Sequence, residues 1–195
     1  MFLDLVKKNR SYRRFYSEKK IAHDTLVGFV EAARYVPSAC NFQNIRYLIV
    51  EEKELCDKVF ETLRFANYLK DWKGPADEEL PAAYIVLMTE KSFDTLLAID
   101  FGIAAQTVLL AAASEGIGGC IFRGFNREKL SSLFSKYGYT PELVIALGVP
   151  SERVEIVDLK DGDVKYYRDE SSTHFVPKRT LDELILTTQE AQMQN

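Results

Sequence analysis

Residues 96–113 form an apolar stretch that contains few polar side chains, chiefly Asp100 and Gln106. Those two would be costly in lipid, and no flanking cationic anchor defines a membrane side, so we expect a core helix and no membrane span. A helix that is apolar on nearly every face is buried on nearly every face. In a chain of 195 residues, covering part of this helix with a second subunit is one way to bury it. The stretch therefore predicts a dimer.

The rest of the chain mixes apolar runs with amphipathic stretches. The strand-like runs are continuously apolar, which indicates a sheet that is covered on both faces. We expect one α+β domain over residues 1–195, with a peripheral C-terminal arm from about residue 151 and a hairpin-like turn signal at Asp161-Gly162. Asp24 is the expected N-cap of the second helix. Helices are predicted at residues 2–9, 25–35, 55–63, 94–115 and 127–134, and strands at residues 46–51, 84–88, 120–122 and 143–149.

Composition excludes several classes of protein. The 25 basic and 29 acidic side chains give a net charge of −4, which argues against a dedicated nucleic-acid binder. The 3 cysteines are too scattered for a disulfide framework, so a reducing compartment such as the cytoplasm is expected. With 2 histidines and no paired cysteines, no metal site is expected. His23 and His174 are predicted to be solvated, because no nucleophile motif accompanies them, and no catalytic acid or base is assigned.

Positive charge is concentrated near the N-terminus of this acidic chain. Arg10, Arg13 and Arg14 surround the hydroxyl of Ser11, and guanidinium groups suit phosphate oxygens. A charge run is more often a solvated face, and nucleic acid would require a broad positive surface. A second basic pair, Lys178-Arg179, could join the first in holding one phosphate monoester. The basic residues of the first cluster are Lys7, Lys8, Arg10, Arg13, Arg14, Lys19 and Lys20, with Glu18 as the acid among them.

The glycines within residues 116–119 suggest a dinucleotide-binding fingerprint at first sight. That motif needs a strand before the glycines and a helix after them, whereas here a helix comes first and a strand follows. A Schellman-type helix end with a tight entry into a strand is the better interpretation. Such a backbone also allows a ligand to approach closely. The chain has no Walker A sequence.

Five motifs in order make the chain resemble the FMN-dependent nitroreductase family. The resemblance implies a nitroreductase-like α+β fold, with a central mixed sheet flanked by helices, and an intertwined homodimer with FMN at the subunit interface. The motifs are N-R-S-Y-R-R-F at residues 9–15, P-S-A-C-N-F-Q at 37–43, an apolar helix over 100–115 leading into G-I-G-G-C at 116–120, A-L-G-V-P at 146–150, and V-P-K-R-T-L-D-E-L at 176–184.

The same resemblance implies roles for single residues. Arg10 and Ser11 match positions near the phosphate and ribityl chain, and Arg13 matches the cation that faces N1 and O2 of the flavin. A positive charge there would stabilise negative charge on the ring. Phe122 and Arg123 fall where the family presents backbone N–H groups to flavin N5. Lys178 and Arg179 match the C-terminal phosphate ligands, and the loop that the partner chain contributes matches Pro37, Ser38, Ala39, Asn41 and Gln43.

The chain departs from the family pattern at several positions. Asn44 follows the loop glutamine, where many members have proline. Arg123 stands where some relatives carry glutamate or glycine, and its charge is expected to favour anionic substrates. Asn67 lies near the position that contacts the pyrimidine edge in some relatives, but the match is poor. Cys40 is expected to pack in the protein, because no partner cysteine is near it in the sequence.

Together these features predict a homodimeric flavoprotein oxidoreductase. Its expected reaction is ping-pong hydride transfer from NADH or NADPH, through FMN, to an electron-poor acceptor such as a nitroaromatic or a quinone. Two alternatives stay open. One is a carrier or sensor that binds FMN without turnover, and the other is a specialised branch that dehalogenates aromatics or fragments the flavin.

Overall fold

The computed structural model describes residues 1–65, 68–69 and 72–186. The chain divides into two compact units, of which the first comprises residues 1–66 and 72–151 and the second residues 67–71 and 152–195. The organisation of residues 1–195 as a single domain stays a prediction.

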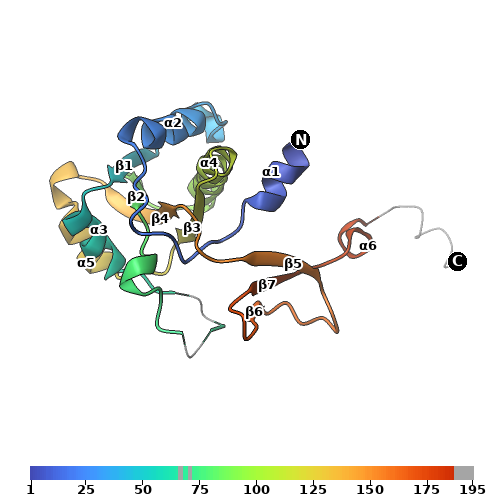
Figure 1. Cartoon of the computed structure of the whole chain (residues 1–195). Helices are drawn as coiled ribbons and strands as arrows, with labels where there is room; N and C mark the ends of the chain where they lie inside the picture. Colours follow the sequence, from blue (N-terminus) through green and yellow to red (C-terminus); the bar gives the residue numbers. More distant parts are fainter. Residues whose placement is uncertain (66–67, 70–71, 187–195) are drawn as a thin grey trace, which may run out of the picture. The chain divides into compact units, whose positions relative to one another are not determined.

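The first unit is built on a four-stranded sheet with the order β1-β2-β4-β3 (Figure 1). All three strand pairs are antiparallel. The parallel component that the term "mixed sheet" predicts is limited here to one isolated bridge, between Ser11 and Gly119. The strands are β1 (Arg46–Val50), β2 (Ala83–Thr89), β3 (Gly118–Phe122) and β4 (Thr140–Gly148).

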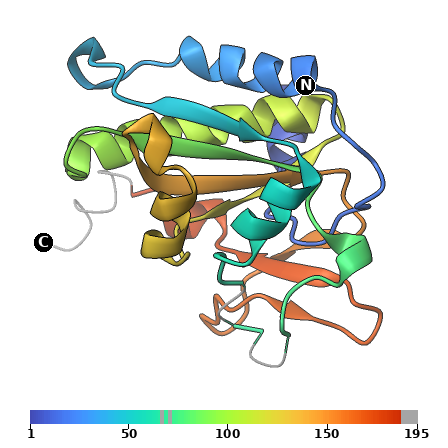
Figure 2. The same ribbon diagram turned by 90° about the vertical axis from the view of Figure 1, so that its left-hand side faces the viewer.

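Helices cover both faces of this sheet, which makes the first unit a three-layer structure (Figures 1 and 2). On one face lie α2 (His23–Arg34) and α4 (Thr95–Ser114). On the other face lie α3 (Lys53–Phe60) and α5 (Arg127–Leu133). The five helices predicted for this part of the chain, of which α1 (Phe2–Lys8) is the first, and the four strands are confirmed, with ends shifted by a few residues.

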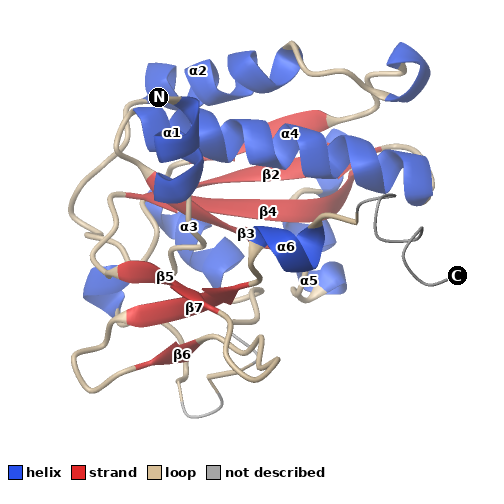
Figure 3. Cartoon of the chain, turned by 90° about the vertical axis from the view of Figure 1, so that its right-hand side faces the viewer, coloured by secondary structure: helices blue, strands red, loops and turns tan. Residues whose placement is uncertain are grey.

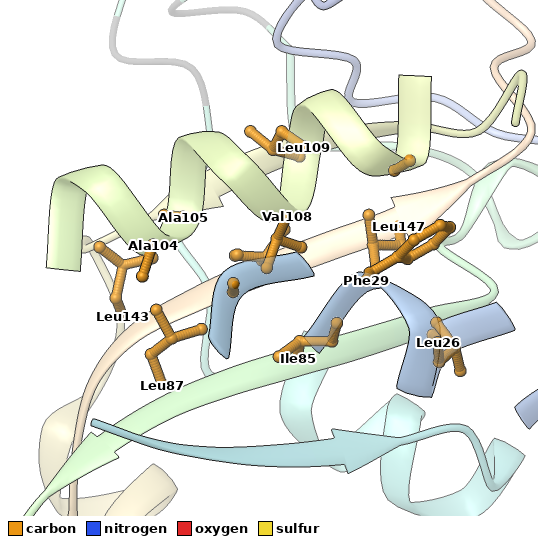
Figure 4. Packing of buried hydrophobic residues seen from close by; sticks show 14 of the residues in the cluster. Leu26, Phe29, Ile85, Leu87, Ala104, Ala105, Val108, Leu109, Leu143 and Leu147 are labelled. Carbon is orange, nitrogen blue, oxygen red and sulfur yellow. The ribbon is translucent and has the colours of Figure 1, made fainter. Parts of the chain in front are cut away.

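A hydrophobic core forms on each face of the sheet. The side chains of β2 alternate between them: Ile85 and Leu87 belong to the core under α2 and α4, and Tyr84 and Val86 to the core under α3 and α5. Successive side chains of a strand point to opposite faces, so a strand between two helical layers must be apolar throughout. Full burial of one such side chain stabilises the fold by about 1.5–3 kcal/mol. Figure 4 shows the first core, including Leu26 and Phe29 of α2 and Ala104, Ala105, Val108 and Leu109 of α4.

Helix α4 is buried along one side and partly exposed along the other. It begins at the N-cap Asp94, whose side chain accepts a hydrogen bond from Leu97 N at 2.7 Å. Leu96 and Ile99, on its outer side, are 56% and 55% exposed. By length and composition α4 is the one helix of the described residues that could cross a membrane, yet 44% of that window is buried in the protein. Within one chain, α4 is therefore not buried on nearly every face as expected. The second subunit that would cover its exposed side stays a prediction.

The predicted Schellman motif closes α4. Ile117 N donates to Ala112 O at 2.9 Å, and Gly116 N donates to Ala113 O at 3.3 Å. Gly116 has a φ of 74°, in the left-handed region that glycine adopts at low cost. The chain then enters the predicted strand, β3, which begins at Gly118, two residues earlier than expected.

The second unit contains a three-stranded sheet with the order β5-β7-β6 (Figure 3). β5 (Val154–Asp158) runs parallel to β7 (His174–Lys178), and β6 (Tyr167–Arg168) runs antiparallel to it. The predicted turn at Asp161-Gly162 forms with φ values of 51° and 72°. The predicted hairpin is wrong, because β5 and β6 both pair with β7 and not with each other. A short helix, α6 (Leu181–Leu184), follows.

Two local predictions are wrong for identifiable reasons. His174 is 2% exposed, because it lies in β7 with its ring 5.1 Å from that of Tyr166. Asp24 is not a cap, since α2 begins at His23 and Asp24 lies in its first turn, where a negative charge interacts favourably with the helix dipole. His23 itself is exposed, as predicted, and pairs with Glu51 at 2.8 Å.

Candidate functional site

The basic N-terminal segment is fixed to the sheet by its backbone. After α1 (Phe2–Lys8), Ser11 forms the parallel bridge to Gly119, and Tyr12 N donates to Gly119 O at 3.0 Å. Further along, Phe15 forms an antiparallel bridge with Pro150. The backbone of residues 11–15 is therefore held in register with the ends of β3 and β4.

Glycines allow this close approach. A Cβ atom on Gly119 would lie 2.6 Å from the backbone oxygen of Ala146, and one on Gly148 would lie 2.7 Å from the ring of Phe15. Real Cβ atoms essentially never come so close to other heavy atoms. The family motifs that contain these glycines thus describe a packing requirement as well as a resemblance.

Arg10 carries a buried donor that no described residue satisfies. Its Nη2 donates to Val6 O at 2.9 Å, but Nε is buried without an acceptor. Burial lowers the pKa of Arg10, because desolvation penalises the charged form, although a guanidinium stays protonated in proteins. A partly buried cation whose N–H is buried and unpaired is stabilised by an anionic acceptor. The residues present therefore fit a phosphate group here.

The other basic side chains of this segment differ in their surroundings. Arg14 Nε donates to Glu79 Oε1 at 2.6 Å, and this ion pair gives Arg14 a structural role that the sequence leaves undecided. Arg13 Nη1 donates to Ser11 O at 3.2 Å. The lysines are exposed, as the prediction of solvated side chains requires: Lys7, Lys8, Lys19 and Lys20.

The loop at residues 37–43 is anchored on α4 by one buried carboxylate. Ala39 N donates to Asp100 Oδ1 at 2.9 Å, and Asp100 is 5% exposed. Within the loop, Gln43 N donates to Ser38 Oγ at 3.2 Å. Sequence reasoning missed this role of Asp100. The signal was available, because a carboxylate inside an apolar helix must find a polar partner.

The backbone of this loop is strained. Cys40, Asn41 and Gln43 have φ values of 48°, 55° and 50°. The left-handed region costs an L-residue roughly 1–2 kcal/mol, and such strain is found preferentially at ligand sites. Cys40 is exposed in this turn, outside both cores, so the prediction that it packs is wrong.

Two cavities border the loop. One, of about 290 Å³, is lined by Pro37, Ser38 and Gln43. The other, of about 360 Å³, is lined by Ala39 and Phe42. Asn44 and Asp100 line both cavities, so the two cavities border the same loop.

At the other predicted contact, the end of β3, side chain and backbone face different environments. Phe122 is 5% exposed, and its ring packs against that of Phe65 with centroids 4.9 Å apart. Only the backbone of Phe122 is therefore available to a ligand. The Arg123 side chain is 56% exposed and lies over the ring of Phe93, with its guanidinium carbon 4.4 Å from the centroid.

The structure does not bring all predicted residues together within one chain. The loop is anchored at Asp100 in the second turn of α4, whereas Ser11 bridges to Gly119, beyond the other end of the helix (Figure 2). At a rise of about 1.5 Å per residue, the helix between Asp100 and Ser114 is about 21 Å long. Lys178 and Arg179 are exposed residues of the second unit, and Asn67 lies outside the described residues.

The described residues offer binding groups and no evident catalytic machinery. No group of three or more His, Cys, Asp or Glu side chains in residues 1–65, 68–69 and 72–186 is arranged to hold a metal ion. The arginines, loop amides and backbone N–H groups suit an anionic, planar ligand that brings its own chemistry.

Fold and site together define an α+β protein in which one antiparallel sheet lies between two helical layers. The segment beside its edge strand β3 carries Arg10, which is suited to bind a phosphate group. The family model described as "Nitroreductase family" matches residues 6–149, and the chain belongs to this family.

Named relatives agree with this assignment. A protein of Methanothermobacter thermautotrophicus, provisionally named NADH dehydrogenase/NAD(P)H nitroreductase, is 28% identical over 170 residues, which cover 83% of each chain. The iodotyrosine deiodinase of Thermotoga neapolitana is 26% identical over 174 residues, covering 78% of this chain and 90% of that protein. A crystal structure of a provisionally named nitroreductase from Exiguobacterium sibiricum, in complex with FMN, has a TM-score of 0.64 at 17% identity and covers 86% of this chain and 97% of that one. The resemblance and the nitroreductase-like α+β fold are confirmed.

Proposed function

We propose that the protein is a homodimeric, FMN-dependent oxidoreductase that uses NADH or NADPH to reduce an electron-poor acceptor such as a nitroaromatic or a quinone. The observation that carries this proposal is the buried, unpaired Nε of Arg10, on a segment whose backbone is bound to β3. Membership of the nitroreductase family supports the redox chemistry.

The chain's residues would bind and orient the cofactor. Arg10, Lys178 and Arg179 bind the phosphate, while Arg13 stabilises negative charge at N1 and O2 of the ring. The backbone N–H groups of Phe122 and Arg123 donate at N5. When bound, FMN supplies the two-electron chemistry that side chains lack. The partner's loop contributes the amides and small side chains of Pro37, Ser38, Ala39, Asn41 and Gln43.

The separation of these groups within one chain supports a dimer. The loop and Ser11 are held near opposite ends of α4, so one ligand can contact both sets only if a second copy supplies the loop. Two α4 helices that cross antiparallel about a two-fold axis place the start of one beside the end of the other. The exposed Leu96 and Ile99 would be covered at such an interface.

The overall reaction needs no catalytic side chain. A quinone, NAD(P)H and one proton give a hydroquinone and NAD(P)⁺, and a nitro group is reduced to nitroso with release of water at the same two-electron cost. Positioning and the fixed donors around the ring would account for the rate. NAD(P)H and the acceptor would bind to the same face of the flavin, one after the other. We therefore expect parallel lines in double-reciprocal plots.

The test starts with the colour of the purified protein. We expect a yellow protein that releases FMN on denaturation and bleaches near about 450 nm when mixed anaerobically with NADH or NADPH. A protein that cannot be reconstituted with FMN would contradict the proposal. A protein that binds FMN but is not bleached by either donor would instead be a carrier or sensor.

A second candidate function is reductive dehalogenation, which the match to iodotyrosine deiodinase favours. In that reaction an aryl halide and NAD(P)H give the arene, NAD(P)⁺ and halide. Two rates measured at the same enzyme concentration separate the candidates: release of halide from an iodophenol and reduction of a nitroaromatic.

We also propose that the protein works in a reducing compartment such as the cytoplasm, without a nucleic-acid partner. All three cysteines are free, and two of them, Cys56 and Cys120, are buried. A nucleic-acid role would appear in filter binding as an affinity that falls steeply with salt.

A further inference from the structure

Three charged side chains meet where β3 ends, α5 begins and β4 starts. Glu142 is 6% exposed and accepts a hydrogen bond from Arg127 Nη2 at 2.9 Å. Arg123 Nη2 lies 3.8 Å from the same carboxylate oxygen. One carboxylate is therefore shared by two guanidinium groups, and this arginine cluster (Arg123, Arg127 and Glu142) has a surplus of one positive charge.

The two guanidinium groups are held in place and remain accessible. Arg123 lies 4.4 Å above the ring centroid of Phe93, and Arg127 lies 5.4 Å above that of Phe125. Their side chains are nevertheless 56% and 46% exposed. A guanidinium that is fixed by an aromatic ring and a carboxylate loses little entropy when it binds a further anion.

The neighbouring segment, residues 62–64, contributes a further cationic side chain, that of Arg64. Arg64 N donates to Gly124 O at 2.8 Å, and Asn126 N donates to Thr62 O at 2.8 Å, so residues 62–64 lie along residues 124–126. The Arg64 side chain is exposed and forms no ion pair with another described residue. Arg64 is thus a third guanidinium group beside the turn that follows β3.

We propose that the arginine cluster selects electron acceptors that carry a carboxylate or sulfonate group, and that Glu142 sets the strength of this preference by neutralising one of the two charges. The inference rests on the proposed function, because it requires the acceptor to bind beside the end of β3. Arg123 and Arg127 attract the anionic group, and a planar carboxylate can accept two parallel hydrogen bonds from either guanidinium.

The test compares two acceptors of similar size, 4-nitrobenzoate and 4-nitrobenzamide. The ratio of their kcat/KM values, anion over neutral, is measured for the wild type and each variant, so the difference in their intrinsic reducibility cancels. We expect Arg123→Ala to lower the ratio about fivefold, because one unit charge is lost near the anion. Glu142→Gln keeps the shape of the side chain and removes its charge, so it should raise the ratio about twofold or more.

These opposite signs separate selection by charge from a structural role. If the cluster only supports the fold, both variants lower both rates and leave the ratio unchanged, and that result would overturn the inference. Should Glu142→Gln not fold, Arg127→Ala replaces it and is expected to lower the ratio, since it removes one of the same positive charges. Lys136→Ala, an exposed cation over Tyr137, is the control. An equal change in that variant would assign the effect to total charge and contradict the inference.

The same samples distinguish failure of this inference from failure of the proposed function. A variant set that contains FMN, is reduced by NAD(P)H and turns over both acceptors with an unchanged ratio overturns the inference alone. A variant could instead change the ratio of the kcat/KM values for NADPH and NADH without changing the acceptor ratio. That result would assign the cluster to binding the donor's phosphate and would also overturn the inference. A wild-type protein that neither binds FMN nor reduces either acceptor rejects both.

Discussion

The two predicted halves of the flavin site are built in different ways. Residues 11–15 are held by backbone pairing with β3 and by glycines that leave no room for a side chain. The loop at residues 37–43 is held by two hydrogen bonds, from Ala39 N to Asp100 and from Arg46 Nη1 to Gln43 O, and retains three left-handed residues. Residues 11–15 are fixed by two bridges and several backbone hydrogen bonds, whereas the loop depends on two side chains, those of Asp100 and Arg46. We therefore expect the first half to be rigid before a ligand binds and the second to adapt to it.

The largest expected effect is a loss of stability where residues 11–15 pack against β3. Gly119→Ala should destabilise the protein by about 2–3 kcal/mol, because its Cβ would lie 2.6 Å from the backbone oxygen of Ala146, which cannot move away easily. Urea unfolding measures the loss. Gly28→Ala in α2 is the matched control, since nothing lies within 4 Å of its Cβ, and it should be neutral or stabilising. Equal losses in the two variants would contradict this account of the sheet edge.

Arg10→Ala should weaken FMN binding about tenfold to a hundredfold, the effect of removing one charge-assisted hydrogen bond to phosphate. The apoprotein should lose little stability, because the variant removes only the hydrogen bond from Nη2 to Val6 O, and Nε has no partner among the described residues. Fluorescence titration with FMN and urea unfolding measure the two effects. Lys8→Ala, an exposed neighbour, should change neither. A large loss of apoprotein stability in the Arg10 variant would show a structural role instead.

Asp100→Ala should remove the attachment of the loop at residues 37–43 to α4. We expect a loss of about 1–2 kcal/mol in the free energy of unfolding, since Ala39 N–H loses its acceptor, together with weaker FMN binding. Asp100→Asn keeps an oxygen at the same place and should retain most of both. If the alanine and asparagine variants behave alike, the hydrogen bond to Ala39 is not the anchor.

The smallest effect is a difference in thiol reactivity. Burial raises the pKa of Cys56 to about 11, so at pH 8 only about one molecule in a thousand carries its thiolate. Iodoacetamide should therefore modify the exposed Cys40 first, and FMN should slow that modification if the loop contacts the cofactor. Mass spectrometry of peptides reads both. Labelling of Cys40 that FMN leaves unchanged would place the loop away from the ligand.

The sequence predicts the framework of this protein because its signals are local. The apolar run at residues 96–113, the glycine that ends α4 and the continuously apolar run of β2 can each be recognised from neighbouring residues. The pairing of Asp100 with Ala39 and of Arg14 with Glu79 joins distant segments, and no spacing rule indicates it. The hairpin prediction failed for the same reason: β7, which is later in the chain, takes both partners. His174 is buried by the same three-stranded sheet, although its neighbours in the sequence are polar.

The site residues divide along the same line. Motif order identified Arg10, Ser11 and the loop as candidates, but it gave no indication that one chain holds them near opposite ends of α4. That separation follows from the length of the helix and from two anchors that only the fold reveals. The sequence predicts a dimer because an apolar helix needs to be covered. The separation gives a second reason, because a second chain would be needed to complete the proposed site.

A mixed dimer tests this central claim most directly. One chain carries Arg10→Ala, and the other carries Asn41→Ala with Gln43→Ala; the two chains bear different affinity tags, are produced together and are purified through both tags. If each site takes residues 10–13 from one chain and residues 37–43 from the other, the mixed dimer retains one intact site and should bind one FMN per two chains, while each variant homodimer binds little. If both sets belonged to the same chain, neither site would be intact, and a mixed dimer without FMN would contradict the account.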